Sequence, residues 1–102
     1  MKDSNLSTIE ELLKPIFIQN AVTRASVFGS FARGDETAES DIDFIVEFAD
    51  GASILNLCCL IEDIRDKMNR PTDVLTLNSL KKEPKEFYER VLRDARVIYE
   101  VS

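Results

Sequence analysis

Two short segments separated by nine residues constrain this chain more than any other feature. Residues 26–30, Ser-Val-Phe-Gly-Ser, form an apolar run that ends in a Gly-Ser pair, and residues 40–46 begin with Ser-Asp-Ile-Asp. Side chains alternate between the two faces of a strand, so we expect Asp41 and Asp43 on one face, roughly 6.5 Å apart. Two such charges repel by about 2–3 kcal/mol at an effective dielectric constant of about 20. A fold that keeps them together therefore either bears this cost or uses a cation to remove it.

The composition is typical of a folded domain with an excess of acids. The chain has 102 residues and 44% of them are hydrophobic, which predicts a single domain over residues 1–102. The net charge of −6 opposes general binding to a nucleic-acid backbone, so we do not expect a nucleic acid as partner. Histidine is absent, which excludes histidine-based triads and histidine-ligated zinc.

The sequence gives no sign of export or of a membrane span. No apolar run approaches the roughly 20 residues that a spanning helix needs, and residues 1–5 have no apolar core typical of a signal peptide. Cys58 and Cys59 are adjacent and cannot form a disulfide framework, so we interpret both as small buried hydrophobic residues. We therefore expect a cytoplasmic protein.

Hydrophobic periodicity and turn residues predict alternating helices and strands. We expect strands at 24–28, 41–48, 71–77 and 96–101, long helices starting at 7, 53 and 84, and short helical turns at 30–33 and just before 84. Ser7, Ser30 and Ser79 are the predicted N-caps of the first helix and of the two turns. Pro15 should kink or split the first helix.

The helix at 53–68 carries a continuous apolar stripe, and three of its apolar residues lie beside that stripe. These are Leu55, Cys59 and Leu60. They either widen the buried face of the helix or contact another chain.

The lengths of the connections predict how the strands pair. Only eleven residues, 30–40, connect the end of the first strand at Gly29 to the second strand, which favours antiparallel pairing. A helix of about sixteen residues joins the second strand to the third, as in a right-handed parallel crossover. The predicted fold class is α/β (α+β), a small mixed β-sheet flanked by helices. The Gly29–Ser30 pair, the Asp-x-Asp pair and Asp73 then lie at one edge of the sheet.

Residues of these types at one edge predict a nucleotide site. Carboxylates of Asp41, Asp43 and Asp73 suit Mg²⁺, which also binds phosphate oxygens. The first two could bridge two ions about 3.5–4 Å apart, and Asp73 could act as a general base. Gly29, Ser30 and Arg33 offer backbone amides, a hydroxyl and a guanidinium to phosphates. Each residue alone is more often a solvated strand edge, a cap or a surface arginine, and only their combination is specific.

The chain resembles the minimal nucleotidyltransferases (MNT domains) of the DNA polymerase β-like superfamily. Their signature is Gly-Ser, ten residues and Asp-x-Asp, matched here by Gly29, Ser30, Asp41 and Asp43, and Asp73 matches the third acid. The stretch 28–34 also resembles the usual form of this turn. The resemblance implies the polymerase β-like fold, two Mg²⁺ ions, and transfer of a nucleoside monophosphate from a nucleoside triphosphate with release of pyrophosphate.

Many small prokaryotic members of this family act as antitoxins of a HEPN-domain ribonuclease, and some transfer AMP to a tyrosine of that toxin. The resemblance therefore implies a Mg²⁺-dependent protein adenylyltransferase that uses ATP and has a HEPN-type toxin as partner. The alternative is a binding module that neutralises a partner by contact without chemistry. The nucleotide preference, the acceptor hydroxyl and the oligomeric state stay open at this point.

Overall fold

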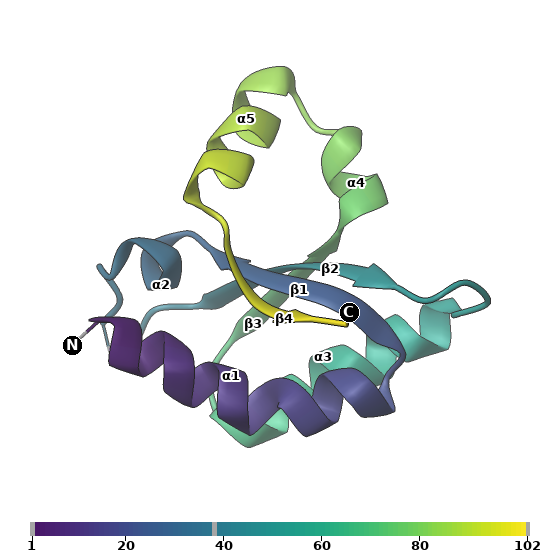
Figure 1. The fold of residues 1–102 in the computed structure, drawn as a ribbon. Helices are drawn as coiled ribbons and strands as arrows, with labels where there is room; N and C mark the ends of the chain where they lie inside the picture. Colours follow the sequence, from purple (N-terminus) through teal and green to yellow (C-terminus); the bar gives the residue numbers. More distant parts are fainter. Residues whose placement is uncertain (1, 38, 102) are drawn as a thin grey trace.

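The computed structural model describes residues 2–37 and 39–101, with side chains from Leu6 onward. Over these residues the elements are α1 (Lys2–Gln19), β1 (Val22–Phe28), α2 (Ser30–Arg33), β2 (Ile42–Phe48), α3 (Ile54–Met68), β3 (Thr72–Thr76), α4 (Leu77–Lys81), α5 (Lys85–Asp94) and β4 (Arg96–Glu100) (Figure 1). Each predicted strand is present within two residues of its expected bounds.

The strands form one mixed sheet in the order β3-β2-β1-β4. β1 is antiparallel to β2 and β4, whereas β2 is parallel to β3. Both predicted pairings are confirmed, since the short link after β1 gives an antiparallel neighbour and α3 connects two parallel strands. The fold is a small mixed α/β sheet flanked by helices, as expected.

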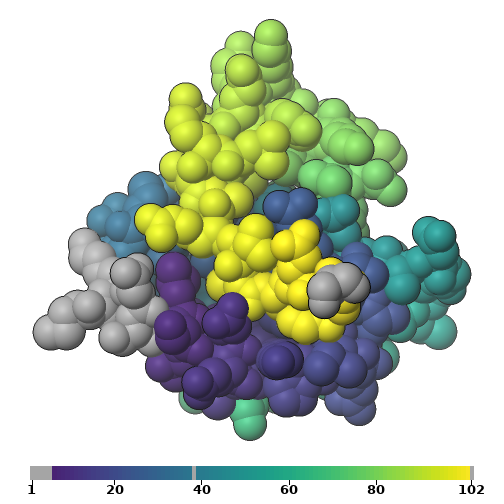
Figure 2. Space-filling view, in the orientation of Figure 1, coloured from purple at the N-terminus to yellow at the C-terminus, as the bar shows by residue number. Residues whose placement is uncertain are grey.

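Alternation along β2 separates two faces of the sheet. Ile42, Phe44 and Val46 are buried on one face, under α1 and α3. The other face carries Asp43 and Ile45, and there α4 and α5 pack over a smaller apolar cluster built from Phe28, Ile45, Leu80 and Val91. Figure 1 shows α1 and α3 on one side of the sheet and α4 and α5 on the other. In Figure 2 the latter pair projects from the body of the molecule.

Three predicted N-caps are wrong. α1 begins at Lys2, so Ser7 lies inside the helix, and α1 also continues unbroken through Pro15. The N-cap of α2 is Gly29, since Ser30 is already the first residue of the helix, and no side chain caps it. Thr76 caps α4, and its hydroxyl oxygen accepts a 3.1 Å hydrogen bond from the backbone N–H of Ser79. Ser53, where a long helix was expected to start, is the N-cap of α3 and forms a capping box with Asn56.

The cysteine prediction is also wrong, because both Cys58 and Cys59 are exposed. α3 presents the side that carries Leu60 and Ile64 to the sheet. Leu60 thus widens the buried face, whereas Leu55 on the far side is 70% exposed.

Across the described part of the chain, the structure holds no helix that is long and apolar enough to cross a membrane.

Candidate active site

Strand register brings the predicted acids to one edge of the sheet. Asp43 lies opposite Phe28 of β1 on one side and opposite Asp73 of β3 on the other. Asp41 is exposed in the segment just before β2. The end of β1 and the starts of β2 and β3 therefore share an edge, as the connection lengths predicted.

The turn after β1 approaches Asp43 closely. Gly29 has φ 72° and ψ −148°, a conformation that is essentially restricted to glycine. A Cβ at this position would lie 2.7 Å from Oδ2 of Asp43. The backbone N–H of Arg33 donates to the carbonyl of Gly29 at 3.1 Å, which closes the turn. Glycine is thus required here both by the backbone and by the adjacent carboxylate.

Asp43 is the electrostatically perturbed acid of the site. The pKa of Asp43 is raised to about 6, chiefly by burial and then by the negative charges of Asp73 and Asp41, while the positive charge of Arg33 opposes the rise. The carboxylates of Asp41 and Asp73 thus both act on Asp43, and the effect of Asp41 is the repulsion that the sequence predicted. A cation beside Asp43 would relieve it.

Arg33 lies close enough to act on Asp43, but its guanidinium is engaged elsewhere. Its Nε donates to Oδ2 of Asp35 at 3.2 Å, and a terminal nitrogen donates to Oδ2 of Asp94 at 3.1 Å. These two hydrogen bonds raise the pKa of Arg33. Asp94 at the end of α5 was not predicted, because it is 61 residues away in sequence and no local pattern marks it.

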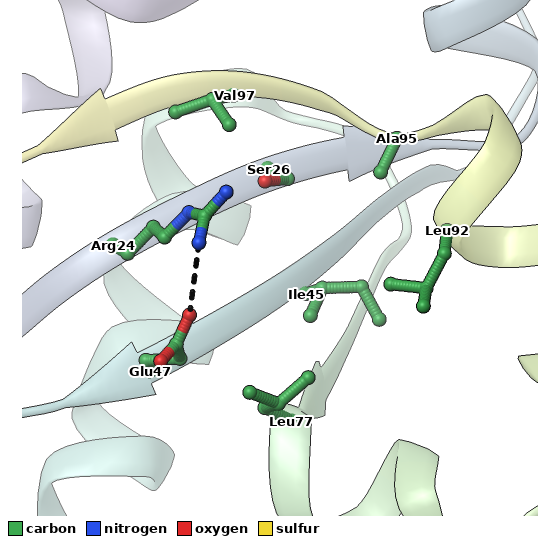
Figure 3. Close-up of a pocket in the computed structure, with 8 residues that line it drawn as sticks. All are labelled: Arg24, Ser26, Ile45, Glu47, Leu77, Leu92, Ala95 and Val97. Atoms are coloured by element: carbon green, nitrogen blue, oxygen red, sulfur yellow. Dashed lines mark ion pairs between the residues drawn. The ribbon is translucent and has the colours of Figure 1, made fainter.

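A cavity of about 310 Å³ opens farther along the same sheet face (Figure 3). Its lining residues are Arg24, Ser26, Ile45, Glu47, Leu77, Leu92, Ala95 and Val97. Arg24 and Glu47 form a 3.8 Å ion pair at one end, opposite the apolar side chains. None of the three aspartates lines this cavity, so the carboxylate site lies outside it, at the strand ends.

The family described as Polymerase beta, Nucleotidyltransferase matches residues 11–102. This chain belongs to that family. The predicted membership and the nucleotidyltransferase class are therefore confirmed.

Curated relatives of this nucleotidyltransferase cover most of its length. MJ0435 of Methanocaldococcus jannaschii, named as a candidate protein adenylyltransferase, is 41% identical over 76 residues, which span 74% of this chain and 82% of the relative. The protein adenylyltransferase MntA of Thermococcus cleftensis is 31% identical over 80 residues, or 74% of this chain and 81% of the relative.

Solved structures share the fold. A structure described as a minimal nucleotidyltransferase superposes with a TM-score of 0.73 at 27% identity, covering 94% of this chain and 95% of the other. A chain from a complex of a tri-AMPylated Shewanella oneidensis HEPN toxin with its MNT antitoxin superposes with a TM-score of 0.65 at 16% identity, covering 99% of this chain and 74% of the other. At 16% identity, the second superposition shows only that the two chains share a fold.

The acids of this nucleotidyltransferase suit a cation that arrives with its substrate. Among residues 6–37 and 39–101, no group of three or more acidic or thiol side chains forms a ready-made metal site. Mg²⁺ is usually bound by one or two carboxylates together with substrate phosphates and water, and not by an all-protein cage. Asp43, with its raised pKa and its acidic neighbours, fits that requirement.

Proposed function

We propose that this nucleotidyltransferase transfers AMP from ATP, with Mg²⁺, onto a tyrosine hydroxyl of a HEPN-type toxin, and that it acts as the antitoxin. The observation that carries the proposal is the meeting of the Gly29 turn with Asp43 and Asp73 at one sheet edge. A tight turn beside paired acids is what a triphosphate with its cation requires.

Each residue of the edge has a part in the proposed reaction. Gly29, Ser30 and Arg33 bind the phosphates, while Asp41 and Asp43 hold two Mg²⁺ ions, with Asp73 as a further ligand. Bound Mg²⁺ would neutralise the charge that develops on the phosphates. Asp73 accepts the proton of the attacking hydroxyl. The hydroxyl oxygen bonds to the α-phosphorus, the bond to the bridging oxygen breaks, and pyrophosphate leaves.

Two observations support AMP as the transferred group and a protein as the acceptor. Relatives at 31–41% identity carry the name protein adenylyltransferase, some of them as candidates. The fold is also shared with chains from toxin–antitoxin complexes, one of which contains an AMPylated HEPN toxin. The exposed Arg33 pairs with two acids at the surface, Asp35 and Asp94, and phosphate oxygens suit its planar guanidinium equally well.

The test is incubation of the protein with Mg²⁺ and α-labelled ATP, with and without a HEPN-type toxin, for which the product of the adjacent gene is the first candidate. We expect label on the toxin with the wild type, and none with Asp41→Asn or Asp73→Asn. Asp66→Asn, which removes an exposed acid of α3, is the matched control and should transfer normally. Toxin with its tyrosines changed to phenylalanine should not be labelled.

Two outcomes would contradict the proposal. If Asp41→Asn still labels the toxin, the Asp41 carboxylate is not required for AMP transfer. A double Asp41→Asn, Asp43→Asn variant that still neutralises the toxin without transferring AMP would favour the contact-only binding module.

A further inference from the structure

Arg70, in the segment between α3 and β3, contacts two other parts of the chain that carry site residues. One terminal nitrogen of its guanidinium donates to the carbonyl of Ser40 at 2.9 Å and to that of Thr37 at 3.3 Å. The Cζ atom of its guanidinium lies over the ring of Phe31, 4.9 Å from the ring centre. The residue is only partly exposed.

Two of these contacts, those to Ser40 and Phe31, lie next to a site residue in the chain. Ser40 directly precedes Asp41, and Phe31 directly follows Ser30. On its own segment, Arg70 precedes Pro71 and Thr72, which lead to Asp73. One side chain therefore connects the Gly-Ser turn, the Asp-x-Asp segment and the start of β3.

The backbone around Arg70 reinforces this connection. The N–H of Ile42 donates to the carbonyl of Pro71 at 3.0 Å, which joins the start of β2 to the segment before β3. The hydroxyl of Thr72 donates to the carbonyl of Arg70 at 3.1 Å, which fixes the arginine backbone. Asp41 therefore lies between two residues, Ser40 and Ile42, that are both hydrogen bonded to the segment 70–71.

Arginine is suited to this position for two reasons. Its planar guanidinium donates hydrogen bonds in a fixed direction and stacks on an aromatic ring at the same time, whereas lysine offers a mobile point charge. Polar surface loops are otherwise the mobile part of a fold. A loop that delivers a metal ligand must hold that ligand to within a fraction of an ångström, and an error of about 1 Å can cost about 100-fold in rate.

We propose that Arg70 is a positioning residue that fixes the carbonyl of Ser40, and with it the Asp41 carboxylate, against the Gly-Ser turn and the start of β3. The inference rests on the proposed function, because it gives Arg70 a role in Mg²⁺–nucleotide binding. Arg70 does not contact the reacting atoms. Arg70 instead positions Asp41, which holds Mg²⁺ in the proposed reaction.

The test compares wild type, Arg70→Met and Arg70→Lys, with Arg90→Met as the matched control, since Arg90 is an exposed arginine of α5. The Mg²⁺ concentration for half-maximal AMP transfer should rise about 10- to 100-fold in Arg70→Met, the range for partners that orient metal ligands. Arg70→Lys should recover only part of this loss. Hydrogen exchange at the amide of Ile42 should become faster in both Arg70 variants, and Arg90→Met should match the wild type.

The outcomes separate this inference from the proposed function. A wild type that transfers no AMP contradicts the proposed function, while the exchange measurement still tests the connection through Arg70. A wild type that transfers AMP, with Arg70→Met showing an unchanged Mg²⁺ requirement, overturns the inference. A lower melting temperature without a change in Mg²⁺ requirement means a purely structural role and overturns it too. If Arg70→Met does not fold, the charge-conserving Arg70→Lys decides by the same two readouts.

Discussion

At the scale of single residues, the site combines a carboxylate that resists ionisation with a glycine that no other residue can replace. Burial and the acids Asp41 and Asp73 disfavour the charge on Asp43. Gly29 lies against the same carboxylate in a conformation that side chains avoid. Stability alone requires neither feature, and under the proposed function both serve to bind a cation and phosphates.

Gly29→Ala should destabilise the protein and abolish transfer. Its backbone conformation costs a side chain about 1–3 kcal/mol, and the new Cβ would displace the Asp43 carboxylate, whose Oδ2 lies 2.7 Å from the Cβ position. Gly51→Ala is the matched control, because Gly51 has φ 89° but nothing within 4 Å of an added Cβ. Thermal unfolding should show a loss in both variants, whereas the transfer assay should show a loss only at position 29. Equal activity of the two variants would mean that contact with Asp43 is irrelevant.

Asp43→Asn should stabilise the metal-free protein at pH 7 and not at pH 4. The pKa of Asp43 is about 6 in the folded chain, above the roughly 3.9 of an unfolded aspartate. The folded state therefore binds the proton more tightly, and this group lowers the free energy of unfolding as the pH rises from about 4 to 6. Asparagine cannot ionise, so the substitution removes this decrease in the free energy of unfolding. In EDTA, we expect the melting temperature of the variant to exceed that of the wild type by a few degrees at pH 7.

Asp50→Asn is the control for this measurement, because Asp50 is an exposed acid in the turn after β2. It should leave the pH trend of the melting temperature unchanged. If Asp43→Asn instead lowers the melting temperature equally at both pH values, the ionised Asp43 carboxylate is not a source of strain.

At the scale of elements, the strands and most helix bounds could be predicted from periodicity and turn residues, whereas the start of α1, the cap of α4 and the exposed face of α3 could not. The Ser-x-x-Glu spacing of Ser7 fits a capping box, but residues three apart also lie on one face of a helix interior. Local sequence does not distinguish these cases. The orientation of α3, which leaves Cys58 and Cys59 exposed, depends on where α1 and the sheet lie.

The two serines provide a direct test of this difference. Ser53→Ala should lower the free energy of unfolding by about 0.5–2 kcal/mol, because its hydroxyl oxygen accepts from the backbone N–H of Leu55 and caps α3. Ser7→Ala should be neutral or slightly stabilising, since Ser7 is an exposed residue inside α1 and alanine favours helix. Denaturant unfolding measures both. If Ser7→Ala lowers the free energy of unfolding as much as Ser53→Ala does, Ser7 is a helix N-cap, as the sequence predicted.

At the scale of the whole molecule, the candidate site lies at the edge between two differently filled faces of the sheet. The larger core under α1 and α3 fixes β2 and its neighbours, and the smaller cluster under α4 and α5 leaves the strand ends accessible. Connection lengths were enough to predict that Gly29, Asp43 and Asp73 meet there. Asp94 and Arg70 could not be predicted, because their contacts with Arg33 and Ser40 join residues that are 61 and 30 positions apart in sequence.

Binding of Mg²⁺ and a nucleotide should raise the stability of the whole fold. A ligand at 100 times its dissociation constant adds about 2.7 kcal/mol, and about 1 kcal/mol moves the melting temperature of a chain of this size by roughly 4–8 °C. With Mg²⁺ and a non-hydrolysable ATP analogue, the wild type should therefore gain about 10 °C or more, and Asp43→Asn should gain far less. In EDTA the variant then has the higher melting temperature, and with Mg²⁺ and the analogue the wild type has the higher one. The reason is that the negative charge of Asp43 destabilises the free site and stabilises the occupied site. An equal gain in both proteins would contradict a cation site at Asp43, whatever the protein transfers.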